Sequence, residues 1–249
     1  MDHIKKLKLV ITAGASGIGA EMAHTLSGAG AKVIICDKDQ AALDQFSKKN
    51  PEVIALKTDV SDEKEVLSLF DEIKNNFGDI NALINNAGVA GPSAKLEDTA
   101  FEDWQNTISV NLNGTFLCSK AAIPLLKSAG GGSIINIGST SSFMGTPLRS
   151  SYSATKWGLI GLTKTWAMEY GKDNIRINTI CPSSVNGERI EQVIKREAKY
   201  RDTTPEKIKA AYLSQTSLKS FIDAEEIVGM IVYLLSPLAK KNHRTNARH

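Results

Sequence analysis

The sequence predicts an α/β fold, a doubly wound parallel sheet with helices on both faces, built as one domain. Three observations support this expectation. Short β-branched runs alternate with longer amphipathic stretches along most of the 249 residues, as is typical of parallel strands joined by crossover helices. The first apolar run leads directly into a glycine-rich segment that opens a helix. No internal repeat, low-complexity tract or linker divides the chain.

Six strands and the helices between them are expected in chain order. The strands are short runs rich in Val, Ile and Leu at residues 8–12, 32–36, 53–56, 80–84, 133–137 and 175–180. The helices are amphipathic stretches at residues 17–29, 40–49, 61–76, 101–128 and 151–170. Gly28 and Gly30 end the first helix, and Ser61 caps the third.

The alternation stops after the sixth strand. Residues 188–200 and 205–215 are typical of polar helices, with mixed charge and few large apolar side chains, so we expect them outside the core. Thr204 caps the second of these, with Pro205 at its first position. Residues 223–235 then form a core helix with acidic residues at its positive end.

The composition excludes several classes of function. Thirty basic and 27 acidic residues leave a net charge of +3, too little for a nucleic-acid footprint or a polybasic membrane anchor. No apolar run approaches the roughly 18 residues of a membrane span, and the N-terminal run is too short for a signal peptide. The histidines have no spacing that gathers a metal. We expect no nucleic-acid partner, no membrane and no metal.

Cysteine usage points to a reducing compartment. Cys36, Cys118 and Cys181 are odd in number and scattered, without the CxxC spacing of a metal or redox motif. They are typical of buried core thiols and do not suggest a disulfide framework. A cytoplasmic location is therefore expected.

A glycine-rich turn follows the first strand, with Gly14, Gly17 and Gly19 opening a helix. Such glycines let the backbone approach a pyrophosphate, whose charge the helix N-terminus stabilises. A plain tight turn remains the alternative. Asp37, 18 positions beyond Gly19 at the end of the second strand, favours the nucleotide interpretation. Its carboxylate would accept from the ribose hydroxyls and repel a 2′-phosphate, although an N-cap or turn aspartate is the competing explanation.

Tyr152 and Lys156 stand four positions apart on an expected helix, so the phenol and the ammonium share one face. A tyrosine with its ordinary pKa near 10 is a poor base at neutral pH. A neighbouring cation lowers that pKa by stabilising the phenolate, which makes a usable acid/base. The spacing alone is weak, because chance pairs on solvated helix faces are frequent.

Further motifs occur in order around these two: Asp59-Val60, Asn85-Asn86-Ala87-Gly88, Asn111, Ser139 and Pro182. Together with the glycines and the Tyr-Lys pair, these motifs have the order and spacing of those in the short-chain dehydrogenase/reductase (SDR) family. Residues 8 to about 237 closely resemble that family. The resemblance implies a Rossmann-type sheet. It assigns residues 1–237 to a single NAD-binding domain, with residues 184–217 as the substrate lid.

The resemblance also implies catalytic roles. Tyr152 would exchange a proton with the substrate oxygen, and Lys156 would bind the nicotinamide ribose and depress the tyrosine pKa. Ser139, 13 positions before Tyr152, would hydrogen-bond the same oxygen; Ser141 and Ser142 compete for that role. Asn111 would hold the water through which the proton leaves, and a turn-forming or helix-kinking residue is a compatible interpretation.

The cofactor residues implied by the family are Gly14, Ser16, Gly17, Ile18, Gly19, Asp37, Asp59, Val60, Asn86, Ala87, Gly88, Tyr152, Lys156, Pro182 and Val185. Members that use NADP usually carry Arg or Lys just before the second glycine or after the second strand. Ser16 and Asp37 fill those places here, with Lys38 beside them. NAD is therefore expected and NADP is disfavoured.

The chain departs from the family pattern at several places. Ala13 replaces the first glycine, which is tolerable at negative φ. Pro182-Ser183 replaces Pro-Gly, and Val185 would offer its backbone N–H to the nicotinamide carboxamide. Ser141 and Arg189 are candidate substrate residues; Arg189 is either a clamp for an anionic substrate or a solvated helix-start residue. The lid's mixed charge does not identify the substrate.

The C-terminal segment, residues 238–249, is the largest departure. It has no aliphatic alternation and no glycine, so we expect the family's seventh strand to be missing. Members of the family continue after Pro237 with a Thr/Ser-Gly-Gln stretch that leads into this strand. If the codons permitted for Lys241 to Arg248 are read one base later, they allow a Thr-Gly-Gln stretch. A frameshift near Lys240 is one hypothesis and a genuine divergent tail the other. A homodimer through helices 101–128 and 151–170 is expected, whereas a tetramer is left open.

The sequence therefore predicts an NAD-dependent oxidoreductase that transfers a hydride between the cofactor and a secondary alcohol or ketone, with Tyr152 as acid/base. A sugar, a polyol or a hydroxyacyl compound are all open as substrate. A catalytically silent nucleotide-binding or regulatory protein is the alternative, and the complete set of Asn111, Ser139, Tyr152 and Lys156 argues against it.

Overall fold

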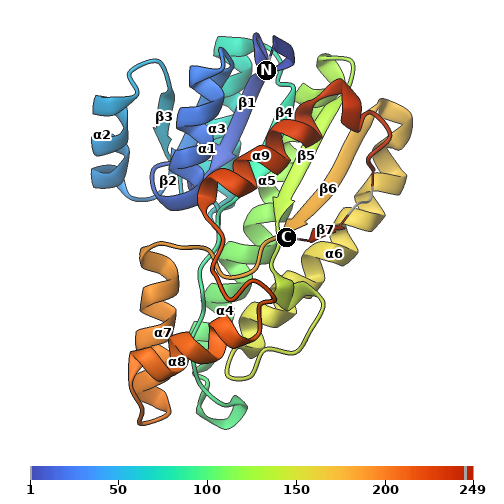
Figure 1. Ribbon diagram of the computed structural model, residues 1–249. Helices are drawn as coiled ribbons and strands as arrows, with labels where there is room; N and C mark the ends of the chain where they lie inside the picture. The colour runs from blue at the N-terminus through green and yellow to red at the C-terminus, as the bar shows by residue number, and fades with distance from the viewer. Residues whose placement is uncertain (1, 244–245, 249) are drawn as a thin grey trace.

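The computed structural model describes residues 2–243 and 246–248. A seven-stranded sheet forms the centre, in the order β3-β2-β1-β4-β5-β6-β7, and every neighbouring pair is parallel. Its strands are β1 (Lys8–Thr12), β2 (Lys32–Asp37), β3 (Ile54–Lys57), β4 (Ala82–Asn85), β5 (Gly132–Ile137), β6 (Ile175–Cys181) and β7 (Asn246–Arg248). Helices cover both faces (Figure 1), so the predicted doubly wound fold is confirmed.

The helices are α1 (Gly17–Gly28), α2 (Gln40–Lys49), α3 (Glu63–Phe77), α4 (Phe101–Ile108), α5 (Gly114–Ser128), α6 (Ser150–Tyr170), α7 (Glu188–Tyr200), α8 (Pro205–Ser214) and α9 (Ala224–Leu235). One apolar core lies between the sheet and helices α1 and α9, and a second lies between the opposite face and helices α3, α5 and α6. The central strands are apolar on both faces because both faces are covered.

Strand order reverses between β1 and β4, which are neighbours in the sheet although β2 and β3 separate them in the chain. In doubly wound sheets, ligands bind at the carboxyl ends of the strands beside such a switch point. Figure 1 shows α7 and α8, drawn in orange, beyond these carboxyl ends and away from the sheet. They pack on each other around a small apolar cluster of their own. This position outside the two main cores is the one expected from their polar sequences.

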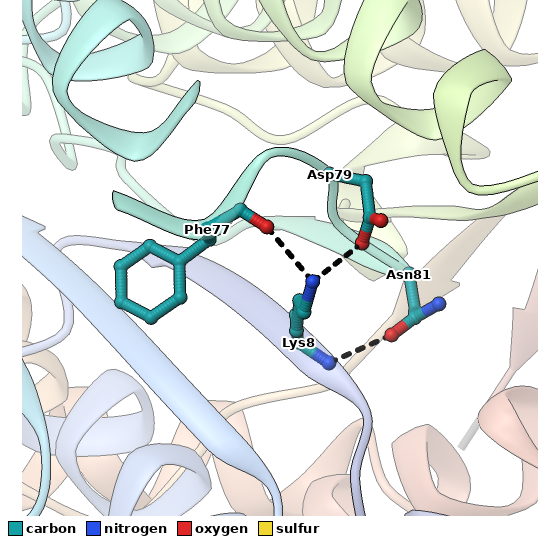
Figure 2. Close-up of polar contacts among 4 residues, drawn as sticks. All are labelled: Lys8, Phe77, Asp79 and Asn81. Atoms are coloured by element: carbon teal, nitrogen blue, oxygen red, sulfur yellow. Dashed lines mark hydrogen bonds and ion pairs between the residues drawn. The ribbon is translucent and has the colours of Figure 1, made fainter. Parts of the chain in front are cut away.

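The opposite end of the sheet is fixed by contacts of Lys8 at the start of β1 (Figure 2). Its Nζ donates to the Phe77 carbonyl at 2.8 Å and to the Asp79 carboxylate at 2.9 Å, and its backbone N–H donates to Asn81 Oδ1 at 2.8 Å. The ion pair is partly exposed, so its electrostatic contribution is modest. Together the three bonds join the start of β1 to the segment before β4, at the end of the sheet remote from the switch point.

Two helix boundaries differ from the predicted ones. The expected helix over residues 101–128 is divided into α4 and α5 by a π-helical segment, Ser109–Asn113. Such one-turn expansions are frequent at functional sites. The third helix is capped by Asp62, whose carboxylate accepts from the backbone of Lys64 and Glu65, and Ser61 lies before the cap.

The expectation that the chain lacks a seventh strand is wrong. Residues Asn246–Arg248 form β7, which pairs in parallel with Thr179–Cys181 of β6. Three residues can pair through backbone hydrogen bonds alone, so the aliphatic alternation of a longer strand is unnecessary. Residues 244, 245 and 249 of the predicted aberrant tail lie outside the described residues.

The segment before β7 covers the rest of the β6 edge. The Ile177 N–H donates to His243 Nδ1 at 3.2 Å, and His243 Nε2 hydrogen-bonds to the Ala167 carbonyl at 2.6 Å. The side-chain amide of Asn178 donates from Nδ2 to the backbone carbonyl of Asn242 at 3.0 Å. Within the described part of the chain, no helix is long and apolar enough to cross a bilayer.

Candidate active site

The sequence motifs come together at the carboxyl ends of four neighbouring strands. The glycine-rich turn follows β1, Asn86 to Gly88 follow β4, Ser139 follows β5 and Pro182 follows β6. Residues separated by more than 160 positions in the chain therefore line one edge of the sheet. This is the edge at which the strand order predicts a ligand site.

The glycine-rich turn has the geometry of a cradle for a charged group. A Cβ on Gly19 would lie 2.0 Å from the Ala13 carbonyl oxygen, so only glycine fits that close approach. Gly17 has a φ of +51° at the start of α1, with nothing within 4 Å of its Cβ position. The N-cap residue Ser16 makes no side-chain capping bond, so the first amides of α1 are not capped by that side chain. These features fit a diphosphate.

Ala13 has a φ of +50°, so the condition under which alanine would be tolerated here at little cost, a negative φ, is not met. The left-handed region costs a residue with a Cβ about 1–2 kcal/mol. The turn holds this conformation because Ala13 lies between the end of β1 and the tightly packed Gly14 and Gly19. Alanine therefore costs conformational free energy at this position that glycine would not.

Asp37 lies directly beside the glycine-rich turn. Its Oδ2 accepts from the Ala15 N–H at 3.3 Å, and its Oδ1 accepts from the Asp39 N–H at 3.2 Å. The carboxylate therefore borders the cradle, where it can accept from ribose hydroxyls and adds negative charge against a further phosphate. The N-cap of α2 is Asp39, so Asp37 is not that cap, but its bond from the Asp39 N–H is the one that a turn aspartate makes, as the other alternative expects.

The segment after β4 is fixed to the end of β1. The Asn86 side-chain amide donates to the carbonyls of Thr12 and Ala13, both at 3.0 Å. The backbone amides of Asn86 and Ala87 donate to the Thr12 hydroxyl. Gly88 follows, and a Cβ there would lie 3.2 Å from the Asn111 side chain. Asn86 thus positions two parts of the site relative to each other.

Asp59 and Val60 lie farther along the same edge. Burial raises the pKa of Asp59, but hydrogen bonds from Ser61 and the charge of Lys38 outweigh it, and the net pKa lies below its ordinary value. The Asp59 carboxylate accepts from both the backbone and the hydroxyl of Ser61. Val60 is buried against Gly114. The carboxylate is thus already engaged in a local turn.

Tyr152 lies on the first turn of α6 and faces several cations. Burial raises its pKa, but the charges of Lys156, Arg189 and Arg149 and a hydrogen bond with Ser139 outweigh burial and lower it from 10 to about 8. Lys156 Nζ lies 5.6 Å from the ring centroid. A phenol with this pKa exchanges protons near neutral pH, as general acid–base catalysis requires.

Lys156 is only 4 % exposed. Burial lowers its pKa, whereas the Tyr152 phenolate raises it. Its Nζ donates to the Ile137 carbonyl at the end of β5, at 2.7 Å, and comes close to Gly88. The ammonium is thus held between the ends of β4 and β5, within electrostatic reach of the phenol.

Of the three candidate serines, Ser139 is the one whose hydroxyl is hydrogen-bonded to Tyr152. Ser139 also caps a short helical turn by accepting from the Ser141 N–H at 3.2 Å. The Ser141 hydroxyl accepts from Thr146, and the Ser142 hydroxyl accepts from the Ser139 N–H. Ser141 and Ser142 therefore hold the loop, and Ser139 faces the phenol.

Asn111 lies buried in the π-helical segment. Its side chain accepts from the Val89 N–H at 2.7 Å and donates to the Val89 carbonyl at 3.0 Å and to the Thr155 hydroxyl at 3.2 Å. It therefore binds the loop after β4 to α6 near Tyr152. Its backbone carbonyl accepts from the Thr115 hydroxyl.

The segment after β6 leads into residues 184–217, the lid segment named from the sequence. The Pro182 carbonyl accepts from Thr140, and residues 184–186 pair with Ile222 through the Ser184 carbonyl and the Asn186 N–H. The Val185 N–H is not used in that pairing. Arg189 is exposed at the start of α7, and its charge acts on Tyr152 and Lys156.

Arg149 is a residue of this site that sequence reasoning missed. It is 6 % exposed, and its guanidinium carbon lies 4.5 Å from the Tyr152 ring centroid. Its Nε donates to the Ala90 carbonyl at 3.2 Å. A signal was present, because Arg149 stands three residues before Tyr152 at the N-cap of α6, where a cation opposes the helix dipole.

A cavity of about 670 Å³ lies between the loop after β4, α4 and α7. Ala90, Gly91 and Ser93 form one wall, and Arg196, Lys199 and Tyr200 of the lid form another. Arg196 also donates to the Gly91 carbonyl at 3.3 Å, which joins the lid to that loop. In the described part of the chain, no group of His, Cys, Asp or Glu side chains is arranged to hold a metal ion.

Comparison with known proteins agrees with this arrangement. Residues 8–198 match the family model described as short chain dehydrogenase. The chain is 35% identical over 234 residues to a D-beta-hydroxybutyrate dehydrogenase of Rhizobium meliloti (strain 1021), covering 90% of each protein. It is 30% identical to a levodione reductase of Leifsonia aquatica, over 92% of this chain and 86% of that protein.

Solved structures of dehydrogenases share the fold of this chain. The chain superposes on an NAD⁺-bound xylitol dehydrogenase with a TM-score of 0.93, at 25% identity, covering 98% of each chain. The similarity thus extends beyond the residues that the family model matches.

Proposed function

This chain belongs to the short-chain dehydrogenase family of oxidoreductases, and from that premise we propose that it is an NAD-dependent enzyme interconverting a secondary alcohol and a ketone. The observation that carries the proposal is Tyr152, a phenol with a pKa of about 8 beside the buried Lys156. Bound NAD would accept or supply the hydride. The chain's own side chains would handle the proton and the orientation of the substrate.

In the oxidation direction, the Tyr152 phenolate takes the hydroxyl proton of the alcohol, and in reduction the phenol gives a proton to the carbonyl oxygen. Ser139 lies within hydrogen-bonding reach of Tyr152, so with substrate bound its hydroxyl would donate to the same substrate oxygen and orient it. Lys156 keeps the phenolate accessible near neutral pH and, from its place at the ends of β4 and β5, would bind the nicotinamide ribose. Asn111 would hold the water that passes the proton to solvent, which is the role that the family resemblance implies for it.

The glycine-rich turn fits a diphosphate, and Asp37 fits an unphosphorylated adenosine ribose. Gly14, Ser16, Ile18, Ala87 and Val185 complete the proposed cofactor site together with the residues already described. The Asp37 carboxylate is the group that would discriminate between NAD and NADP, because a 2′-phosphate would lie against it.

Asp37→Ser should therefore raise kcat/KM with NADP relative to NAD, by about 10-fold or more for the loss of one charge–charge repulsion at close range. Asp44→Ser removes the same charge from the exposed face of α2 and serves as control. Steady-state kinetics with both cofactors measure the ratio. An unchanged ratio in Asp37→Ser would refute the assignment.

The relatives' names do not choose a substrate, because they include hydroxybutyrate, levodione and xylitol. NAD binding measured by fluorescence quenching, followed by a panel of alcohols and ketones, tests the proposed reaction. Turnover of a secondary alcohol or a ketone supports it. NAD binding without turnover across sugars, polyols and hydroxyacyl compounds would instead favour a silent nucleotide-binding protein.

We also propose a homodimer through α5 and α6. Large apolar side chains are exposed on these helices: Phe116 at 46%, Trp157 at 53% and Met168 at 73%. Light scattering should give twice the chain mass of 26.9 kDa, and Phe116→Glu should shift the protein toward monomer by placing a charge in the interface. Leu218→Glu, at an exposed leucine after α8, is the control. A wild-type mass of one chain would contradict the proposal.

A further inference from the structure

We propose that the substrate of this enzyme carries a carboxylate, and that Arg149 binds it beside Tyr152. The inference rests on the proposed function and makes its substrate class specific: a short hydroxy acid or the corresponding keto acid. Nothing in the family match assigns Arg149 a role. The argument depends on the burial of Arg149, its place on α6 and the charges around it.

Arg149 is a buried cation whose charge is not balanced by a carboxylate. It is only 6 % exposed, and none of the ion pairs among the described residues includes it. Burying an unpaired guanidinium is costly, and proteins normally pair such groups. Burial accordingly lowers the pKa of Arg149. A ligand carboxylate would remove this imbalance, because guanidinium binds carboxylates through paired, charge-assisted hydrogen bonds.

The position of Arg149 on the helix strengthens the argument. It is the N-cap residue of the 21-residue α6. The positive end of a helix dipole disfavours a cation and favours an anion. The contacts of Arg149 with Ala90 and Tyr152 supply no opposite charge, whereas an anion bound there would interact favourably with both the guanidinium and the helix end.

The guanidinium is held in a defined orientation with donors remaining. Its Nε donates to the Ala90 carbonyl at 3.2 Å, and the Tyr212 hydroxyl of α8 is a second partner. Tyr212 donates in turn to Glu197 at 2.9 Å. Arginine has five N–H donors, so these two partners do not exhaust its capacity. Arg149 is thereby fixed against both the loop after β4 and the lid.

The charges that face Tyr152 are predominantly positive. Arg189 and Lys156 act on the phenol together with Arg149, and Arg196 acts on Arg149. Glu197, the acidic side chain bonded to Tyr212, is also engaged by Arg201 at 2.7 Å. Asp103 lies across the cavity among Arg196 and Lys199. An anionic substrate would balance this excess, whereas a neutral one would leave it.

The geometry also limits the length of the substrate. The guanidinium carbon lies 4.5 Å from the Tyr152 ring centroid. A carboxylate bound to Arg149 would therefore lie in the neighbourhood of the Tyr152 side chain. This spacing fits a carbonyl separated from the carboxylate by a short carbon chain.

The test compares each keto acid with its uncharged methyl ester, using acetoacetate and 4-oxocyclohexanecarboxylate with NADH. The acid-to-ester ratio of kcat/KM cancels effects on the chemistry of Tyr152, which both substrates share. We expect the wild type to favour the acid by about 10–100-fold, the range of a hydrogen bond to a charged group. Arg149→Gln should lower this ratio toward one, and Arg149→Lys should keep part of it.

Lys164→Gln is the matched control, since it removes one positive charge from an exposed site of the same helix and should leave the ratio unchanged. Wild-type turnover of esters as fast as acids would overturn the carboxylate proposal while leaving the proposed reaction standing. An acid preference that survives in Arg149→Gln would overturn the assignment of Arg149. Should Arg149→Gln not fold, the wild-type ratio and Arg149→Lys still decide.

Calorimetry with butyrate and butyramide at saturating NAD⁺ separates the two proposals. Butyrate binding by the wild type, absent for butyramide and weakened about 10-fold or more in Arg149→Gln, supports the carboxylate site even where no ketone is reduced. In that case only the proposed reaction fails. Equal binding of butyrate and butyramide would overturn the site.

Discussion

Tyr152→Phe should lower kcat for alcohol oxidation by about 10²–10⁴-fold, the usual contribution of a general acid–base. The substitution removes one hydroxyl and keeps the ring, so the contacts of the ring with Arg149 and Lys156 remain. The dissociation constant for NAD⁺, measured by fluorescence quenching, should change little. Loss of turnover with retained binding would assign Tyr152 to the proton step and not to cofactor binding.

The pH profile gives a second measurement of the same residue. Because the Tyr152 pKa is about 8, the phenolate that oxidation needs forms as the pH rises through 8, and kcat/KM for the alcohol should rise with it. Ketone reduction needs the phenol and should fall over the same interval. Tyr233→Phe, on the exposed side of α9, should retain wild-type activity. Undiminished turnover by Tyr152→Phe would refute the mechanism.

Lys156→Met should lower oxidation at pH 7 by about 100-fold. The ammonium is the foremost of the charges that lower the Tyr152 pKa, so without it the pKa moves from about 8 toward or beyond the ordinary value near 10. Two pKa units correspond to a hundredfold loss of phenolate at neutral pH. The deficit should therefore shrink as the pH approaches 10, and the midpoint of the profile should move upward.

Controls distinguish this electrostatic role from a structural one. Lys156→Met also leaves the Ile137 carbonyl without its donor, so thermal unfolding must be measured beside activity. Lys156→Arg keeps the charge and should keep the midpoint near that of the wild type. Lys164→Met removes a charge from the same helix away from the site and should alter neither. An unshifted midpoint in Lys156→Met would contradict the proposed coupling to Tyr152.

Most of the fold follows from local patterns. The six predicted strands lie within one or two residues of the observed ones, because each is a short apolar run, and all but the edge strand β3 are buried. The seventh strand was missed because β7 depends on the outer edge of β6 and not on its own side-chain pattern. The break in the helix over residues 101–128 was missed for a similar reason: the packing of Asn111 against Val89 is not visible in that segment's periodicity.

The candidate site was predictable where spacing along one element decides it. Tyr152 and Lys156 share a face because they are one helical turn apart, and Asp37 lies beside the glycine turn because β1 and β2 are paired in register. The place of Arg149 three residues before Tyr152 was visible in the sequence, but its burial was not predictable, because it depends on Ala90 and on Tyr212, about 60 residues away on either side. The left-handed conformation of Ala13 likewise arises from the close packing of Gly19.

The outer edge of β6 has a consequence for how copies of this chain can associate. Unpaired strand edges act as templates for strands of other molecules, which leads to domain swapping and fibrils. At this outer edge, the Ile177 N–H donates to the imidazole of His243, and among the described residues the pairing with β7 covers Thr179–Cys181. A partner that is part side chain and part three-residue strand does not extend the sheet efficiently. This edge is thereby shielded against the addition of strands from other molecules.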